Sequence, residues 1–158
     1  MDQHKAKHSS SPYSGQQNRA IKALSASEVE GLLNGRGMGL ARVAELNHYP
    51  GPMHVLELAR ELGLTPAQKA QVQALRDSMH QAARIGRLIV AQEKKLEDLF
   101  AGGKASEGSV AAIVREIGRL QAENRLVHLR AHVRMKEILS AEQVAKYDAL
   151  RGYHQQVG

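Results

Sequence analysis

The amino-acid sequence predicts an all-α protein whose main element is a long antiparallel helical hairpin, with short helices flanking it on the N- and C-terminal sides. Aromatic residues make up only 3% of the chain and Trp is absent, so the core must be built from Leu, Val, Ile, Ala and Met, which suit packed helices. Two long segments carry apolar residues at helical spacing. Only the short linker 101–106 separates them, which favours an antiparallel pair.

The 158 residues are enough for one domain of ordinary size. Residues 1–19 are polar, so we expect a flexible N-terminal arm that adds nothing to the core. Residues 20–153 carry the helical pattern and form the single predicted domain. Residues 154–158 form a short tail.

Three short helices are predicted on the N-terminal side of the hairpin. Ser25 and Glu28 can form a capping box, in which each residue hydrogen-bonds the other's backbone, and Gly35 lies just past the end of the helix that they begin. A second helix is expected over residues 40–47 and a third over residues 53–62.

The hairpin is predicted from two apolar stripes at helical spacing. The first long helix begins after Thr65 and runs to about residue 100. Its stripe consists of Val72, Leu75, Met79, Ala82, Ile89 and Leu96. The second long helix begins near Ser106 or Ser109 and ends at Leu139. Its stripe consists of Val110, Ile113, Ile117, Leu120, Val127, Ala131 and Ile138.

Two five-residue segments repeat one way of starting a helix. They are Leu64-Thr65-Pro66-Ala67-Gln68 and Leu139-Ser140-Ala141-Glu142-Gln143. Thr65 and Ser140 are the predicted N-caps, and Gln68 and Gln143 lie where a side chain can reach back and close a capping box. The second segment opens a last short helix that ends before Gly152.

The two segments resemble the paired LTxxQ motifs of the Spy/CpxP family, and the resemblance extends over roughly residues 11–153. It implies an exported periplasmic protein that forms a cradle-shaped homodimer from interlocked hairpins. It also implies an ATP-independent chaperone for unfolded or misfolded envelope proteins, or a stress-response protein that dampens a membrane sensor kinase. We therefore expect a signal peptide to have been removed ahead of Asp2; a cytoplasmic chain would begin in the same way.

A basic surface fits the chaperone function that the resemblance implies. The net charge is +6, and an excess of Lys and Arg attracts acidic partners over a distance. Adaptable apolar side chains could then hold a client. The candidate client-binding residues on the two long helices are Arg84, Arg87, Lys94, Arg115, Arg119, Leu126, Leu129, Arg130, Val133 and Arg134. Ordinary solvated positions explain the cations equally well, and the apolar strip of Leu126, Leu129 and Val133 fits a dimer seam or a place under the short helices as well as a client surface.

The histidines suggest an alternative function, the binding of a transition metal. His128, His132 and Met135 are spaced so that they project from nearly one side of a helix, and two imidazoles with a thioether suit Cu, Ni or Co better than Zn. The CnrX/ZraP-like relatives bind or sense such metals, which adds His54 and Glu57 as candidate ligands. Partly packed histidines explain the same pattern, and the chaperone function requires no cofactor.

The sequence contains none of the motifs that would indicate an enzyme, such as G-x-S-x-G, H-E-x-x-H or a P-loop, so we expect a non-enzymatic protein. A pI of about 9.8 leaves nucleic-acid binding as a third, less favoured function. The basic residues alternate with acidic ones, and no basic recognition helix stands out.

Overall fold

The computed structural model describes residues 9–153, and these residues form helices without strands, which confirms the predicted fold class. The elements are η1 (Gln16–Asn18), α2 (Ala26–Leu33), α3 (Arg42–Glu45), α4 (Pro52–Glu57), α5 (Ala59–Leu62), α6 (Pro66–Ser78), α7 (His80–Ala101), α8 (Glu107–Ile138) and α9 (Ala141–Arg151). No helix within residues 9–153 is both long enough and apolar enough to cross a membrane. The predicted tail and the first eight residues of the predicted arm lie outside the described part.

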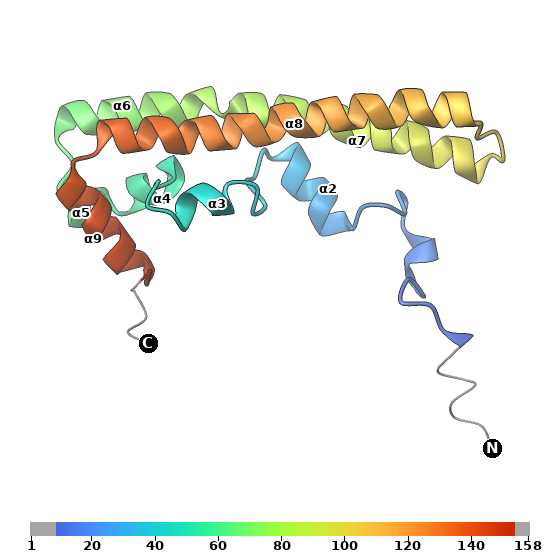
Figure 1. Ribbon diagram of the computed structural model, residues 1–158, viewed down its shortest axis with the longest axis horizontal. Helices are drawn as coiled ribbons and strands as arrows, with labels where there is room; N and C mark the ends of the chain where they lie inside the picture. The colour runs from blue at the N-terminus through green and yellow to red at the C-terminus, as the bar shows by residue number, and fades with distance from the viewer. Residues whose placement is uncertain (1–8, 154–158) are drawn as a thin grey trace, which may run out of the picture.

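The predicted hairpin is the long rod in Figure 1, where α6 and α7 form one arm and α8 returns beside them and crosses this arm, lying below α6 at one end and above α7 at the other. The short helices α2, α3 and α4 lie along one face of this rod, and α9 turns away from its end. Near the other end, Lys22 holds the N-terminal segment to α7, because its backbone N–H and its Nζ both donate to the Glu97 carboxylate at 2.8 Å.

The first arm of the hairpin contains a break that the sequence pattern did not predict. We expected one helix from residue 66 to about residue 100, and the structure divides it at Met79 into α6 and α7. The Ser78 hydroxyl donates to the Leu75 carbonyl at 2.7 Å, and Nδ1–H of His80 donates to the Asp77 carbonyl at 2.6 Å. These side chains bind carbonyls that the backbone N–H groups of a continuous helix would use. Such competition bends helices. The predicted helix over residues 53–62 is likewise divided, at Leu58.

The apolar core consists of two clusters placed one after the other along the hairpin. The cluster at the motif end joins α4, α5, α6, α8 and α9 through Val55, Leu62, Val72, Met135, Leu139, Val144 and Tyr147. The second cluster joins α7 and α8 through Ile85, Ile89 and Leu120. Six residues of the predicted stripes are buried in the structure, namely Val72, Ala82, Ile89, Ile117, Leu120 and Ala131.

The two motif glutamines bind each other across the end of the hairpin. The predicted capping boxes are present: Gln68 accepts from the Thr65 backbone N–H, and Gln143 accepts from that of Ser140. The two side-chain amides also exchange hydrogen bonds of 2.8 and 2.9 Å. Gln68 further donates to the Ile138 carbonyl, and Gln143 donates to that of Leu62. Each amide therefore caps its own helix and satisfies a carbonyl at the end of another helix.

A second network attaches α9 to the end of α3 and to the loop that follows it. The Tyr147 hydroxyl donates to the Glu45 carboxylate, and Nδ1–H of His48 donates to Asp148 at 2.5 Å. Burial and the Glu45 carboxylate raise the pKa of Tyr147, so this phenol stays protonated and remains a donor.

Helix α2 approaches α7 so closely that only glycine fits at residue 86. A Cβ on Gly86 would lie 1.8 Å from the Leu32 carbonyl oxygen, a distance that forces the backbones apart. Gly118, on α8, offers a contrast, because its Cβ would meet nothing within 4 Å.

We expect the motif glutamines to act as one unit. Gln68→Ala or Gln143→Ala should each cost about 1–3 kcal/mol of unfolding free energy, because each leaves polar partners without hydrogen bonds. Urea denaturation of both single variants and of the double variant should give a coupling energy within about 0.5–3 kcal/mol. Gln121→Ala, at an exposed position on α8, is the control and should change stability by less than about 0.5 kcal/mol. Simple additivity would contradict the paired amides.

The approach of α2 to α7 gives a second prediction with a built-in control. Gly86→Ala should lower the free energy of unfolding by about 1–3 kcal/mol, because the added methyl group overpacks the contact between α2 and α7. Gly118→Ala should stabilise it by about 0.5–1 kcal/mol, because alanine is the better helix former and has open space there. The midpoint temperature of thermal unfolding should therefore fall for Gly86→Ala and rise for Gly118→Ala, relative to the wild type. Equal midpoints would mean that α2 does not pack on α7 in this way.

Candidate functional site

The predicted client-binding side chains lie exposed along the hairpin. All seven of the predicted cations are exposed. Within the described residues, Lys94 pairs with Asp98 and Arg119 with Glu116, whereas the remaining five make no ion pair there. Leu126 and Val133 are 45% and 49% exposed, and Leu129 is half-buried. The apolar strip therefore lies open on this single chain and does not lie under the short helices.

Three further large apolar side chains on the hairpin are exposed, and sequence reasoning missed them. Leu88 on α7 and Val114 on α8 are each about half exposed, and Phe100 at the end of α7 is 61% exposed. All three fall outside the predicted buried stripes, and this was the signal that could have identified them.

A groove of about 1030 Å³ lies between the hairpin and the short helices. Its walls come from the loop after α2, from α3 and α4, from the region of the α6–α7 break, from α8 and from the end of α9. The groove contains four histidines and three methionines, namely His54, His80, His128, His132, Met38, Met53 and Met79. Arg36, Arg42, Arg76 and Arg151 also line it.

The structure separates the five candidate metal ligands. His54, His128 and His132 line the groove, whereas Met135 is fully buried in the cluster at the motif end. Glu57 is exposed and accepts a hydrogen bond from Nδ1 of His54 at 3.0 Å. Met135 and the histidines do project from one side of α8, but different elements cover that side along its length, so a shared direction does not give a shared site.

His128 lies in an unusual polar section of the hairpin. It is only 3% exposed, and among the described residues its buried Nε2 has no hydrogen-bond partner, nor does the buried side-chain oxygen of Asn124 one turn earlier. Burial, with a smaller contribution from His132, holds the pKa of His128 below its ordinary value. His132 is better satisfied, because its Nδ1–H donates to the Tyr49 carbonyl at 2.6 Å.

His80 and the three groove methionines were not predicted as part of a site. Met79 belongs to the predicted buried stripe and His80 follows it, but the helix break turns both toward the groove. The sequence offered a sign of this break in Ser78 and His80, whose side chains can bond nearby carbonyls.

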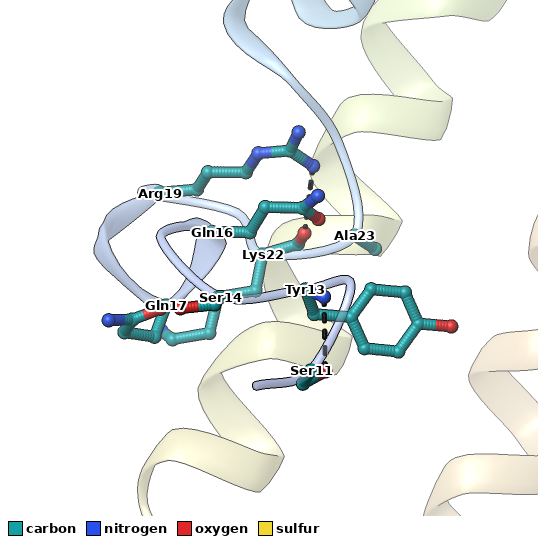
Figure 2. Close-up of a pocket in the computed structure, with 8 residues that line it drawn as sticks. All are labelled: Ser11, Tyr13, Ser14, Gln16, Gln17, Arg19, Lys22 and Ala23. Carbon is teal, nitrogen blue, oxygen red and sulfur yellow. Dashed lines mark hydrogen bonds between the residues drawn. The ribbon is translucent and has the colours of Figure 1, made fainter. Parts of the chain in front are cut away.

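A second hollow, of about 620 Å³, lies within the N-terminal segment (Figure 2). Short local bonds shape it: the Ser11 hydroxyl accepts from the Tyr13 backbone, and Arg19 donates to the Lys22 carbonyl. Tyr13 points outward and is largely exposed. This hollow is formed by one continuous segment and contains no group of side chains suited to chemistry.

We expect the stability of the chain to fall in mild acid because of His128. A histidine whose pKa is lowered by folding binds fewer protons when folded, so its contribution is complete above the unfolded pKa of about 6.5 and is lost as pH falls toward the folded pKa. In urea denaturation from pH 7.5 to pH 5, His128→Leu should lose less stability than the wild type. Gln121→Ala, at an exposed position without a titrating side chain, is the control and should keep the wild-type dependence of stability on pH. Identical slopes for His128→Leu and wild type would refute this account.

A model of a family described as "LTXXQ motif family protein" matches residues 51–151. The matched part includes helices α4 to α9 and both five-residue motifs. No curated protein and no solved structure matches the chain significantly. Proteins of this family are generally periplasmic, and it is not known as an enzyme family. The chain therefore belongs to the LTXXQ motif family of Spy/CpxP-type proteins.

Proposed function

We propose that this protein is a periplasmic, ATP-independent chaperone that holds unfolded or misfolded envelope proteins on the exposed face of its hairpin. The observation that supports the proposal most directly is the strip of exposed Leu126 and Val133 with half-buried Leu129, which lies on α8 together with arginines that make no ion pair within residues 9–153. A monomeric protein rarely leaves contiguous apolar side chains open without a partner for them.

Charge and apolar contact have different roles in this proposal. Arg115, Arg130 and Arg134 are exposed and make no ion pair among the described residues, so they attract acidic segments of a client over about a Debye length, about 8 Å at physiological salt. The leucine and valine side chains then hold apolar segments without requiring one sequence. The same strip could form the seam of a homodimer, and a membrane sensor kinase could be a signalling partner in place of a client.

The second candidate function is the binding or sensing of a transition metal. The collection of histidine and methionine side chains around one groove supports it. Among residues 9–153, no group of three or more His, Asp or Glu side chains is placed to hold one metal ion. This candidate therefore depends on the thioethers as well as the imidazoles.

One aggregation experiment tests the chaperone proposal. Light scattering from a chemically unfolding model client should fall when the full chain is added without ATP and in the presence of a chelator. Leu126→Asp with Val133→Asp should weaken suppression severalfold, because charge replaces the apolar contact. Leu150→Asp is the matched control, since Leu150 is similarly exposed but lies on α9, and it should retain suppression.

The same experiment separates the two candidates. Suppression in chelator would support the chaperone function and make metal unnecessary for it. Suppression that appears only when Cu, Ni, Co or Zn is added, and that is lost in the His128→Ala, His132→Ala double variant, would instead support the metal function.

A further inference from the structure

The groove between the hairpin and the short helices is positively charged. Four arginines and two carboxylates are among the side chains that line it, which leaves a net charge of +2 when the histidines are neutral. The arginines come from the loop after α2, from α3, from α6 and from α9, and they are Arg36, Arg42, Arg76 and Arg151. The fold therefore brings cationic side chains from four separate parts of the chain to one hollow.

The two carboxylates already have hydrogen-bond partners, whereas arginines remain available. Glu45 accepts from the Tyr147 hydroxyl, and Asp77 accepts from a glutamine one turn earlier on α6 at 2.9 Å. Arg42 and Arg76 are exposed, and neither makes an ion pair within residues 9–153. Guanidinium groups bind carboxylates and phosphates through paired, charge-assisted hydrogen bonds. The groove thus has free cations for an anion that enters it.

The same groove has an apolar wall that is open to solvent. Met38, Leu46 and Met53 line the groove and are 46%, 54% and 45% exposed. Methionine side chains are flexible and adapt to the shape of an apolar ligand. Large apolar side chains that are exposed together indicate a surface that another apolar group covers.

The backbone at Met38 supports a binding role for this wall. Its φ angle is 51°, in the left-handed region that residues other than glycine rarely adopt. A Cβ on Gly31 would lie 2.6 Å from the Met38 sulfur, so the missing side chain at residue 31 leaves room for the thioether. Strained residues of this kind collect at ligand-binding sites. The chain thus accepts an unfavourable backbone conformation at a residue that lines the groove.

The charge and the apolar wall together indicate the class of ligand. An inorganic anion would leave the apolar wall in water, and an uncharged hydrocarbon would leave the arginines without a partner. A single acyl chain with an anionic head satisfies both. The groove volume of about 1030 Å³ is near the upper end of the range for small-molecule sites, about 300–1,000 Å³. An extended peptide fits less well, because helical walls use their backbone groups internally and offer it few main-chain hydrogen bonds.

We propose that this groove binds a long-chain fatty acid, with its carboxylate held by the arginines and its acyl chain against the methionines and Leu46. Each methylene group that the groove buries should raise the affinity about fourfold. The affinity should also fall as salt is added, because the arginines attract the head through charge. This inference goes beyond the chaperone function, since the exposed strip of Leu126 and Val133 does not line the groove.

The test uses dodecanoate, below the concentration at which it forms micelles, and the full chain labelled with ¹³C at the methionine methyl groups. At pH 7.5, dodecanoate should shift the methyl resonances of Met38 and Met53. The resonance of Met135 should stay in place, because this residue is fully buried in the cluster at the motif end. Decanoate has two methylene groups fewer and should bind about tenfold more weakly. Acetate, which lacks the chain, and dodecyltrimethylammonium, which has the opposite charge, should each bind more weakly still.

Two double variants test the role of the arginines. Arg42→Gln with Arg76→Gln should weaken dodecanoate binding more than about tenfold, because it removes the charge-assisted hydrogen bonds to the carboxylate. Arg60→Gln with Lys95→Gln is the matched control. It removes two exposed cations that do not line the groove, and it should bind dodecanoate as the wild type does.

Several results would overturn the proposal. Unchanged resonances of Met38 and Met53 would exclude the groove, and this mapping uses the wild-type chain, so it holds even if a variant fails to fold. Equal binding of dodecyltrimethylammonium would show that the arginines do not select the head. Equal binding of acetate would make the groove a site for small anions, and tighter binding of a model acidic peptide would make it a peptide site. None of these readouts depends on client aggregation, so the chaperone proposal stands or falls separately.

Discussion

Two side-chain amides join the parts of this fold that the chain itself places far apart. Gln68 begins the hairpin and Gln143 begins the helix that follows it, so their mutual hydrogen bonds close the hairpin at its open end. Each amide also satisfies a carbonyl at the end of another helix. Half-buried helix ends would otherwise keep unpaired carbonyls, and the apolar cluster around Val72 and Tyr147 lies in this region. The recurrent motif thus has a physical reason: it satisfies the backbone where four helices meet.

Local chemistry explains what the sequence could predict. A serine or threonine with Glu or Gln three residues later begins α2, α6 and α9, because the two groups satisfy each other within one turn. Apolar spacing identified both arms of the hairpin for a similar reason. The Gln68–Gln143 pairing and the groove were not predictable in this way, since each depends on side chains meeting across the fold. The break at Met79 is local, and Ser78 and His80 were the sign of it that the pattern of apolar residues did not reveal. Met135 illustrates the limit: it shares a helix side with His128 and His132 and yet belongs to the core.

The break in the first arm and the groove have a common origin. Ser78 and His80 bond carbonyls of the preceding turn, and this frees the chain to bend where α4 packs against it. The same hydrogen bond holds the His80 ring, which lines the groove. One local competition for backbone carbonyls therefore shapes both the arm and one wall of the groove. The hairpin's outer strip of Leu126 and Val133 lies apart from this groove and does not line it.

The polar section formed by Asn124 and His128 divides the hairpin into parts of unequal cohesion. Toward the motif end, five helices share one apolar cluster, whereas toward the loop end Ile85, Ile89 and Leu120 form a smaller one. Between them, Asn124 and His128 keep buried polar atoms that make no hydrogen bond within residues 9–153. Local opening of a protein costs least where few buried apolar contacts hold a region closed. The loop end of the rod therefore has less apolar contact to hold it closed than the end that the paired glutamines join.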